Sequence, residues 1–332
     1  MWKDNGKTSS SFVAEGAVLA ALAAVLGLLG IYVPPLRVVV HFVWMIPLIF
    51  VTMRWGVRKG AAVLLVTGVL ITLLSTPVEA ILLLVEYGGL ALVYGYAFQR
   101  MVPLRKTLFW GVLTAGAGAV MVLGISMLFL QLRPADLLTQ LNMAIDGVVG
   151  AYEEAGFFSN GEGGQGATRE QIEGMSRQIS RLMLMLIPSI LVMISMATAI
   201  ISLILTRGVF HRLRIPVPEK LPPFRQWRFD FRLAYGFIAG LVLFLGGESL
   251  AGGAVRVIGS NLLVAFGFLF LIQGLAVAVY VFRERKGLRF AKIFLVVLAL
   301  IYMQFTVLVL FFVGLFDLFF DYRKGLEKRR MS

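Results

Sequence analysis

The sequence predicts an all-α protein, a polytopic transmembrane helix bundle with eight or nine spans. Of its 332 residues, 59% are hydrophobic and only 15% are charged, whereas a soluble domain is about 45–50% apolar. The mean hydropathy of the chain is +0.88. Nine apolar stretches come close to the roughly 20 residues that a helix needs to cross about 30 Å of hydrocarbon. These observations leave no room for a large soluble domain.

The nine stretches follow one another with short connections, except after the fifth. They cover residues 12–33, 38–53, 60–76, 78–98, 107–130, 181–206, 233–247, 258–282 and 290–318. Because the stretch 233–247 is short, we expect it to cross the membrane incompletely, which leaves eight true crossings.

Lysine and arginine collect in alternate connections, and such connections face the cytoplasm. The basic connections are 54–59, 100–106, 207–232 and 283–289. Their alternation predicts a multi-pass protein of the bacterial inner membrane with a cytoplasmic N-terminus. The C-terminal tail from Arg323 to Arg330 is also basic, although nine crossings would place it outside, and this conflict favours eight crossings.

The long connection 131–180 is acidic, unlike the others, and is therefore expected outside the cell. Its apolar residues repeat every three or four positions from Leu137 to Tyr152, which is typical of an amphipathic helix. The glycine-rich stretch 160–166 then predicts a flexible turn.

A second external helix is expected after this turn, because Thr168 with Gln171 forms a capping box. An apolar stripe from Ile172 to Met183 leads into the sixth span. We therefore expect a two-helix external lid with a glycine hinge, whose second helix runs straight into the span and stands beyond the bilayer.

Several classes of protein are disfavoured by composition. The chain has no cysteine and only two histidines, His41 and His211, in different segments, so no metal site is expected. None of the sequence motifs of hydrolases, metalloproteases, nucleotide-binding proteins or kinases occurs, so we expect neither an enzyme nor a cofactor. The formal charge is +13, but basic loops of a polytopic protein meet anionic lipid. The expected partner is the lipid bilayer and not nucleic acid.

The strongest candidate for a binding residue is Glu86, near the middle of the fourth span. A carboxylate at that depth costs roughly 3 kcal/mol and indicates function by default. Tyr87 and Tyr94 on the same span, and His41 at the outer mouth of the second, complete a predicted substrate-binding set. The alternatives are a protonated glutamate that only fixes packing and a histidine hydrogen-bonded at the membrane interface.

Five other ionisable residues lie near the ends of spans, where their side chains can reach water at little cost. They are Glu15, Glu79, Glu248, Arg256 and Asp317. We expect them to face solvent without a binding role.

Small residues in the first span predict a helix-docking face. Ala17, Ala20, Ala21 and Ala24 follow small-xxx-small spacing, which lets helix backbones approach closely in lipid. The partner helix can belong to a membrane coupling subunit or to the same chain.

The order of three N-terminal motifs resembles a known class of transport proteins. The motifs are "AEGAVLAALAAVLGLLGIYVPP", "HFVWMIPLIFVTMRWGVRKG" and "GAAVLLVTGVLITLL". Over residues 8–206 they resemble the S components of energy-coupling-factor transporters, which are six-helix receptors for vitamins or metal ions. Over its whole length the chain resembles the YybS-like family of uncharacterised bacterial membrane proteins.

The likeness to S components implies that Ala17, Ala20, Ala21 and Ala24 dock on a coupling subunit. It also implies that the outer loops after the first, third and fifth spans enclose a ligand. This chain differs in its longer loop after the fifth span and in its additional C-terminal spans.

The predicted organisation is an S-component-like region, 1–206, with the external insertion 131–180, followed by a basic cytoplasmic loop, 207–232, and the additional spans and basic tail, 233–332. The predicted function is binding or transport of a small solute. The alternative is a non-transporting scaffold or regulator that acts through helix docking and its basic loops.

Overall fold

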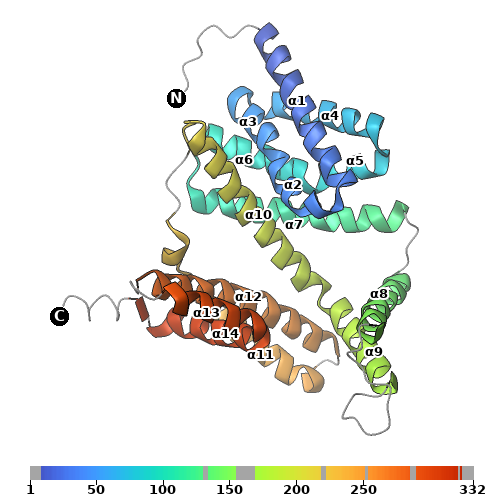
Figure 1. Ribbon diagram of the computed structural model, residues 1–332, viewed down its shortest axis with the longest axis vertical. Coiled ribbons are helices and arrows are strands. Elements are labelled where there is room, and N and C mark those ends of the chain that lie inside the picture. The colour runs from blue at the N-terminus through green and yellow to red at the C-terminus, as the bar shows by residue number, and fades with distance from the viewer. Residues whose placement is uncertain are drawn as a thin grey trace, which may run out of the picture. The chain divides into compact units, whose positions relative to one another are not determined.

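The computed structural model describes residues 9–129, 134–154, 169–217, 222–250, 253–284, 289–320 and 322–323. Every regular element in these ranges is helical, which confirms the all-α class (Figure 1). The elements are α1 (Ser9–Tyr32), η1 (Pro34–Leu36), α2 (Arg37–Val43), α3 (Met45–Trp55), α4 (Val57–Leu74), α5 (Pro77–Leu83), η2 (Leu84–Gly88), α6 (Gly89–Gln99), α7 (Leu104–Phe129), α8 (Pro134–Glu154), α9 (Arg169–Met185), α10 (Ile187–Arg212), η3 (Phe224–Gln226), α11 (Leu233–Leu250), α12 (Gly253–Glu284), α13 (Arg289–Ile301) and α14 (Met303–Phe320).

Seven helical segments in the described ranges are long and apolar enough to cross a membrane, and two shorter apolar helices accompany them. The polytopic architecture is therefore confirmed. The predicted glycine hinge at 160–166 and the capping residue Thr168 lie outside the described residues.

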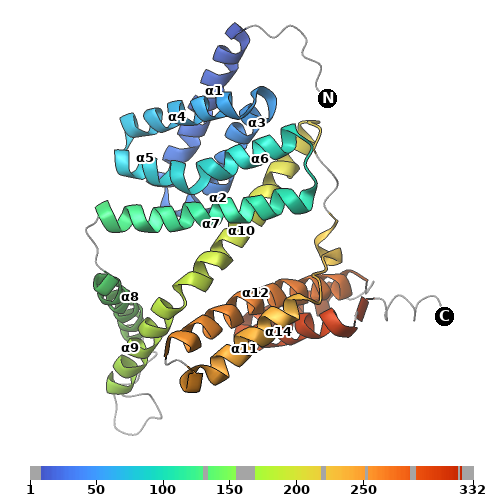
Figure 2. The ribbon, with the colours of Figure 1, turned by 180° about the vertical axis from the view of Figure 1, so that it is seen from behind.

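The chain divides into two compact units. Unit 1 comprises Met1–Ala144 and Ile194–Lys220, and unit 2 comprises Ile145–Met193 and Leu221–Ser332. In Figure 2 the helices α1 to α7 of unit 1 run from blue to green, and α11 to α14 of unit 2 run from orange to red. Residues 145–154 and 169–180 of the predicted external insertion thus group with the C-terminal helices.

In unit 1 the basic connections share one end with the start of α1. A carboxylate oxygen of Glu15 in α1 lies 2.9 Å from the guanidinium of Arg54 at the end of α3. Phe210, near the end of α10, packs edge-on against Phe98, near the end of α6, with ring centres 5.8 Å apart. The connections brought to this end are 54–59, 100–106 and 212–217. Their shared position agrees with the predicted alternation of basic loops.

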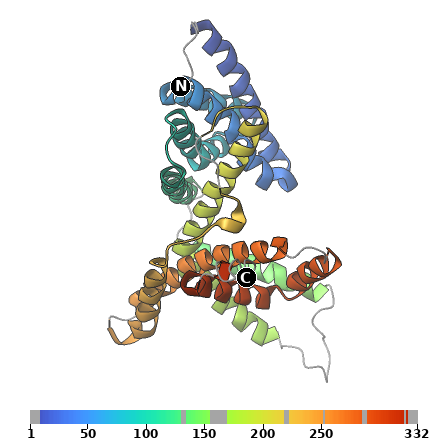
Figure 3. The same cartoon turned by 90° about the vertical axis from the view of Figure 1, so that its left-hand side faces the viewer.

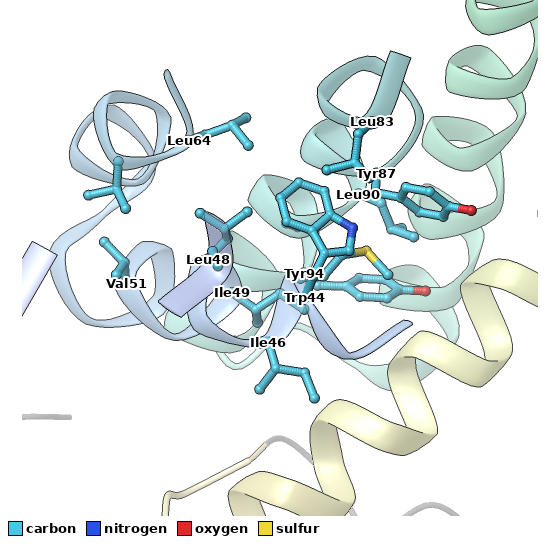
Figure 4. Close-up of a cluster of buried hydrophobic side chains, with 14 of the residues drawn as sticks. Trp44, Ile46, Leu48, Ile49, Val51, Leu64, Leu83, Tyr87, Leu90 and Tyr94 are labelled. Carbon is cyan, nitrogen blue, oxygen red and sulfur yellow. The ribbon is translucent and has the colours of Figure 1, made fainter. Parts of the chain in front are cut away.

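The core of unit 1 is built around α3, which packs against α1, α4 and α6. Trp44, Met45, Leu48 and Ile49 are completely buried there (Figure 4). The approach of α6 to α3 requires glycine at position 95, because a Cβ atom there would lie 2.3 Å from a side-chain carbon of Thr52.

In unit 2, α11 and α12 form an antiparallel hairpin, whereas α14 runs parallel to α12. Gly247 of α11 faces Arg256, and Gly236 faces Phe266. Gly314 of α14 contacts Phe270 of α12, and Asp317, three residues later in α14, contacts Gln273, three residues later in α12. The two helices therefore run in the same direction. Figure 3 shows the orange and red helices packed together.

The last predicted span, 290–318, is broken into α13 and α14 at Tyr302. The backbone N–H of Tyr302 donates to the carbonyl of Leu298, which is the last such bond of α13. The carbonyl of Tyr302 accepts the backbone N–H of Thr306 at the start of α14. The hydroxyl of Thr306 also donates to the carbonyl of Ala299, 3.0 Å away, which the break would otherwise leave unpaired. Neither proline nor glycine marks this position, so the sequence pattern missed the break.

This break changes the path of the chain near its C-terminus. Because α14 runs parallel to α12, the intervening helix α13 must run in the opposite direction, away from the end of α12. Its 13 residues cover only about 20 Å at 1.5 Å per residue. The chain then returns along α14 to the end where α12 finishes. The stretch 233–247 forms most of α11, pairs with α12 from Gly236 to Gly247, and is one of the two shorter apolar helices. Its incomplete crossing stays a prediction, and α13 is a second short segment.

A buried ion pair joins the end of α14 to the connection before α11. Asp317, expected to reach water, is only 5% exposed, and one of its carboxylate oxygens accepts hydrogen bonds from Gln273 (2.7 Å) and Arg323 (3.0 Å). Arg323 also donates to the backbone carbonyl of Arg225 at 2.7 Å, and the carboxamide oxygen of Gln273 accepts the backbone N–H of Phe229 at 3.1 Å. Within unit 2, Arg323 and the basic connection 222–232 therefore lie at the same end.

The other four span-end residues behave differently from Asp317. Glu15 pairs with Arg54, and Glu79 accepts hydrogen bonds from Ser75 and Thr76. The exposed guanidinium of Arg256 lies 5.0 Å from the centre of the Phe244 ring. The side chain of Glu248 lies outside the described residues.

Candidate functional site

Glu86 and Tyr87 lie on a short π-helical turn, η2, that interrupts the fourth span between α5 and α6. Such π-helical turns are rare in proteins, but those that occur often lie at functional sites. The extra residue in the turn rotates the following side chains relative to a regular α-helix. Glycines let neighbouring helices approach this turn closely. A Cβ atom at Gly118 of α7 would lie 2.8 Å from the carbonyl oxygen of Glu86, and one at Gly88 would lie 2.8 Å from Leu64.

The turn places Tyr87 beside His41 of α2. The Tyr87 hydroxyl lies 3.5 Å from Nδ1 of His41, and the two ring centres are 5.3 Å apart. Gly30 of α1 makes room for the imidazole, since a Cβ atom there would lie 3.2 Å from it. Two segments 46 residues apart in sequence thus meet at the end of unit 1 opposite its basic connections.

Arg37 completes this group from the start of α2. The turn at Pro34 sets the position of Arg37, whose backbone N–H bonds to the Pro34 carbonyl. Its guanidinium acts electrostatically on Glu86, Tyr87 and His41. Glu86 precedes Tyr87 on the same π-helical turn. We call Arg37, His41, Glu86 and Tyr87 the outer cluster.

The solvent exposure of the outer cluster decreases from Arg37 to the buried aromatic rings of Tyr87 and Trp44. Arg37 is exposed, His41 and Glu86 are half-buried, and Tyr87 is buried. Beneath them Trp44 is completely buried, with its ring 6.5 Å from that of Tyr87 at nearly a right angle. In the described part of the chain no acceptor lies within hydrogen-bonding distance of the Trp44 indole N–H. The cluster therefore offers a guanidinium, a carboxyl group, an imidazole and a phenol hydroxyl over an apolar base.

Tyr94, predicted as part of the same set, lies elsewhere. Its hydroxyl donates to the backbone carbonyl of Ala199 in α10 at 2.7 Å, and its ring stacks on Phe98. Figure 4 shows Tyr94 two turns along the fourth span from Tyr87, with its hydroxyl pointing to the same side. The structure brings together His41, Glu86 and Tyr87 and separates Tyr94, which joins α6 to α10.

The four alanines of the first span divide between two faces. Ala20 and Ala24 are buried inside unit 1, and the Thr67 hydroxyl of α4 lies 3.5 Å from the Ala20 carbonyl. Ala17 and Ala21 are exposed. Part of the small-residue pattern thus serves packing of α1 on α4, and docking of a partner helix stays a prediction.

Arg37 and Trp44 were not among the predicted site residues, although the sequence carried a signal for them. Arg37, His41 and Trp44 follow the spacing i, i+4, i+7, which places them along one face of a helix. Because Pro34 and Pro35 separate this segment from the first span, the helix begins at Arg37, and His41 and Trp44 contact Tyr87 of the fourth span.

Unit 2 contains a separate hollow of about 360 Å³. Its lining is apolar apart from Gln304, and comes mainly from α12 and α14: Met193, Val264, Gly267, Phe268, Leu271, Gln304, Val307, Leu308 and Phe311. It lacks the charged groups of the outer cluster, so its chemistry suits hydrocarbon and not a polar solute.

The chain is an integral membrane protein. Its helices are apolar and long enough to span a membrane, its basic connections lie at one end of each unit, and a few polar side chains lie within its apolar helices. The family described as "Predicted membrane protein (DUF2232)" matches residues 21–318, and the chain belongs to this family. The chain is 24% identical over 324 residues to the uncharacterized protein YybS of Bacillus subtilis (strain 168), which covers 94% of this chain and 97% of that protein. The predicted YybS-like membership is confirmed. No solved structure matches the chain, so the likeness to S components stays a prediction.

Proposed function

We propose that unit 1 binds a small polar solute at the outer cluster, in the manner of a transporter S component. The observation that carries this proposal is the π-helical turn that holds Glu86 and Tyr87 against His41. An acidic side chain within a span is costly and is typical of a substrate or ion pathway. The arrangement is suited to a solute with a donor or cationic group for Glu86 and an acceptor or anionic group for Arg37.

The buried side of the cluster supports this chemistry. A hydrogen bond over the apolar floor formed by Trp44 is stronger than one in water, because the local dielectric constant is low. The unmatched Trp44 indole N–H offers one further donor at that depth. Such a mixture of apolar walls and a few polar groups is typical of small-molecule sites.

Tyr87→Phe is expected to weaken solute binding about tenfold, because one hydrogen bond to a bound group contributes about 0.5–1.5 kcal/mol and 1.4 kcal/mol corresponds to tenfold. Glu86→Gln should impair binding while keeping the fold, since the amide retains the shape of the carboxylate. The matched control is Tyr96→Phe, because Tyr96 is on the same span and is exposed. Native mass spectrometry of the purified full-length variants measures the occupancy of any co-purifying small molecule.

The proposal fails if no bound small molecule is detected with the unaltered protein. It also fails if Tyr87→Phe and Glu86→Gln retain the same occupancy as Tyr96→Phe. Coupling subunits that co-purify without a solute would favour the scaffold role, in which the exposed Ala17 and Ala21 contact a partner.

We further propose that the basic ends of both units face the cytoplasm of the bacterial cell. The chain has no native cysteine, so single cysteines report topology without interference. Gln226→Cys and Tyr322→Cys should both resist a membrane-impermeant maleimide in intact cells and react after permeabilisation. Leu36→Cys, at the opposite end of unit 1, should react in intact cells. Reaction of Gln226 and Tyr322 from opposite sides would contradict the return of α14.

A further inference from the structure

The helix α9 turns its apolar side chains away from the rest of the protein. Met175, Ile179 and Leu182 are 59%, 40% and 51% exposed, whereas Ser180 is completely buried. This is the reverse of a helix that packs on its own chain, which would bury the apolar residues and expose the serine. The apolar stripe of α9 is therefore available to an outside surface.

The stripe continues into the surface of the following span across a break at Leu186. Ile179, Met183, Leu186 and Ile190 follow one another at three or four residues, so they share one helix face. Ile190 is exposed on α10, a helix of membrane-spanning length. One apolar surface thus extends from the α9 stripe to the exposed Ile190 of α10.

The break itself is held by Asn261 of α12. Pro188 lacks a backbone N–H, so the helical hydrogen-bond ladder is interrupted there. The Asn261 carboxamide donates to the carbonyl of Met185 at 2.8 Å and accepts the N–H of Ser189 at 2.9 Å. The expected straight continuation of α9 into the sixth span is therefore corrected to two helices joined at a side-chain bridge.

The position of this bridge limits how far the stripe can lie from the membrane. Asn261 is five residues, about 7.5 Å, along α12 from the exposed Arg256. The guanidinium of Arg256 lies over the Phe244 ring. We take Arg256 to mark the membrane interface, where charged and aromatic side chains gather. Ile179 is six residues, about 9 Å, from Met185 at the bridge. Ile179 therefore lies at most about 1.5 Å farther out along the helix direction than Arg256, and Met175, four residues further along α9, at most about 7.5 Å farther.

We propose that α9 is an interfacial helix whose apolar stripe inserts into the outer boundary between lipid headgroups and acyl chains. Its opposite face carries the exposed Arg177 and Arg181, about half a turn from Ile179. Interfacial helices have this arrangement, with the apolar face buried about 5–10 Å and the basic face toward phosphate groups. The partner of this surface is the phospholipid bilayer, independently of any solute at the outer cluster.

Single cysteines in the otherwise cysteine-free chain test the proposal. Met175→Cys and Ile179→Cys, with Arg181→Cys as the control on the opposite face, are labelled with an environment-sensitive fluorophore. The full-length protein is reconstituted in vesicles of phosphatidylethanolamine and phosphatidylglycerol. Labels at 175 and 179 should be quenched by brominated lipid and at least threefold less by iodide than the label at 181.

Two results would overturn the proposal. Iodide access at 175 and 179 equal to that at 181 would mean that α9 stands in water. Protection of 175 and 179 from both quenchers would mean that protein covers the stripe. Asn261→Leu gives a second measurement, because loss of the bridge should change lipid quenching at Ile179 and leave quenching at Arg181 unaltered. Unchanged quenching at Ile179 would exclude Asn261 as the residue that holds α9 in place.

Discussion

Asp317→Ala is expected to destabilise the protein by about 3–5 kcal/mol, because it leaves the guanidinium of Arg323 buried without its counter-charge. Arg323 is 1% exposed and Asp317 is 5% exposed, so water cannot replace the lost partner. The change also removes the acceptor of the Gln273 side chain. The thermal midpoint of the purified full-length protein in detergent is the measurement.

Removing both charges should be much less harmful than removing one. The double variant Asp317→Leu with Arg323→Met leaves no unpaired charge, and such replacements are often neutral or stabilising. A double-mutant cycle then isolates the pairing energy. Asp230→Ala is the control, because Asp230 is exposed and its carboxylate accepts a hydrogen bond from the nearby backbone N–H of Arg232. Equal midpoints for Asp317→Ala and Asp230→Ala would refute the importance of the buried pair.

Gly274→Ala or Gly314→Ala is expected to abolish the packing of α12 on α14. A Cβ atom at Gly274 would lie 1.9 Å from the carbonyl oxygen of Leu310, and one at Gly314 would lie 1.8 Å from that of Phe270. Because the obstacle is backbone, no side-chain rotation can relieve it, and the helices must separate. We expect a large loss of folded protein, measured as monodisperse yield after detergent extraction.

The control for this prediction is Gly267→Ala on the same face of α12. A Cβ atom there would meet the ring of Phe311 at 3.6 Å, which is an ordinary contact. Its yield should match that of the unaltered protein. Comparable yields for Gly274→Ala and Gly267→Ala would show that the close crossing is absent in the membrane.

The sequence pattern predicted the helical class, most of the spans and the basic connections, because these depend on local hydropathy and charge. It predicted Glu86, Tyr87 and His41 as site residues, and the structure brings these three together. It missed the break at Tyr302, where the hydroxyl of Thr306 substitutes for a backbone donor without any proline or glycine signal. It also misjudged Asp317, whose partners lie in other segments.

The sequence by itself determined that this protein is a bundle of membrane helices in which every second connection is basic. In lipid each span must satisfy its own backbone hydrogen bonds, so the positions of most spans follow from local composition. Only the tertiary structure decided which side chains meet. His41 reaches Tyr87 because a π-helical turn rotates the fourth span, and Asp317 is buried because α14 returns along α12 to Gln273. Such contacts depend on helix breaks and glycine crossings that join distant segments, and no local pattern specifies them.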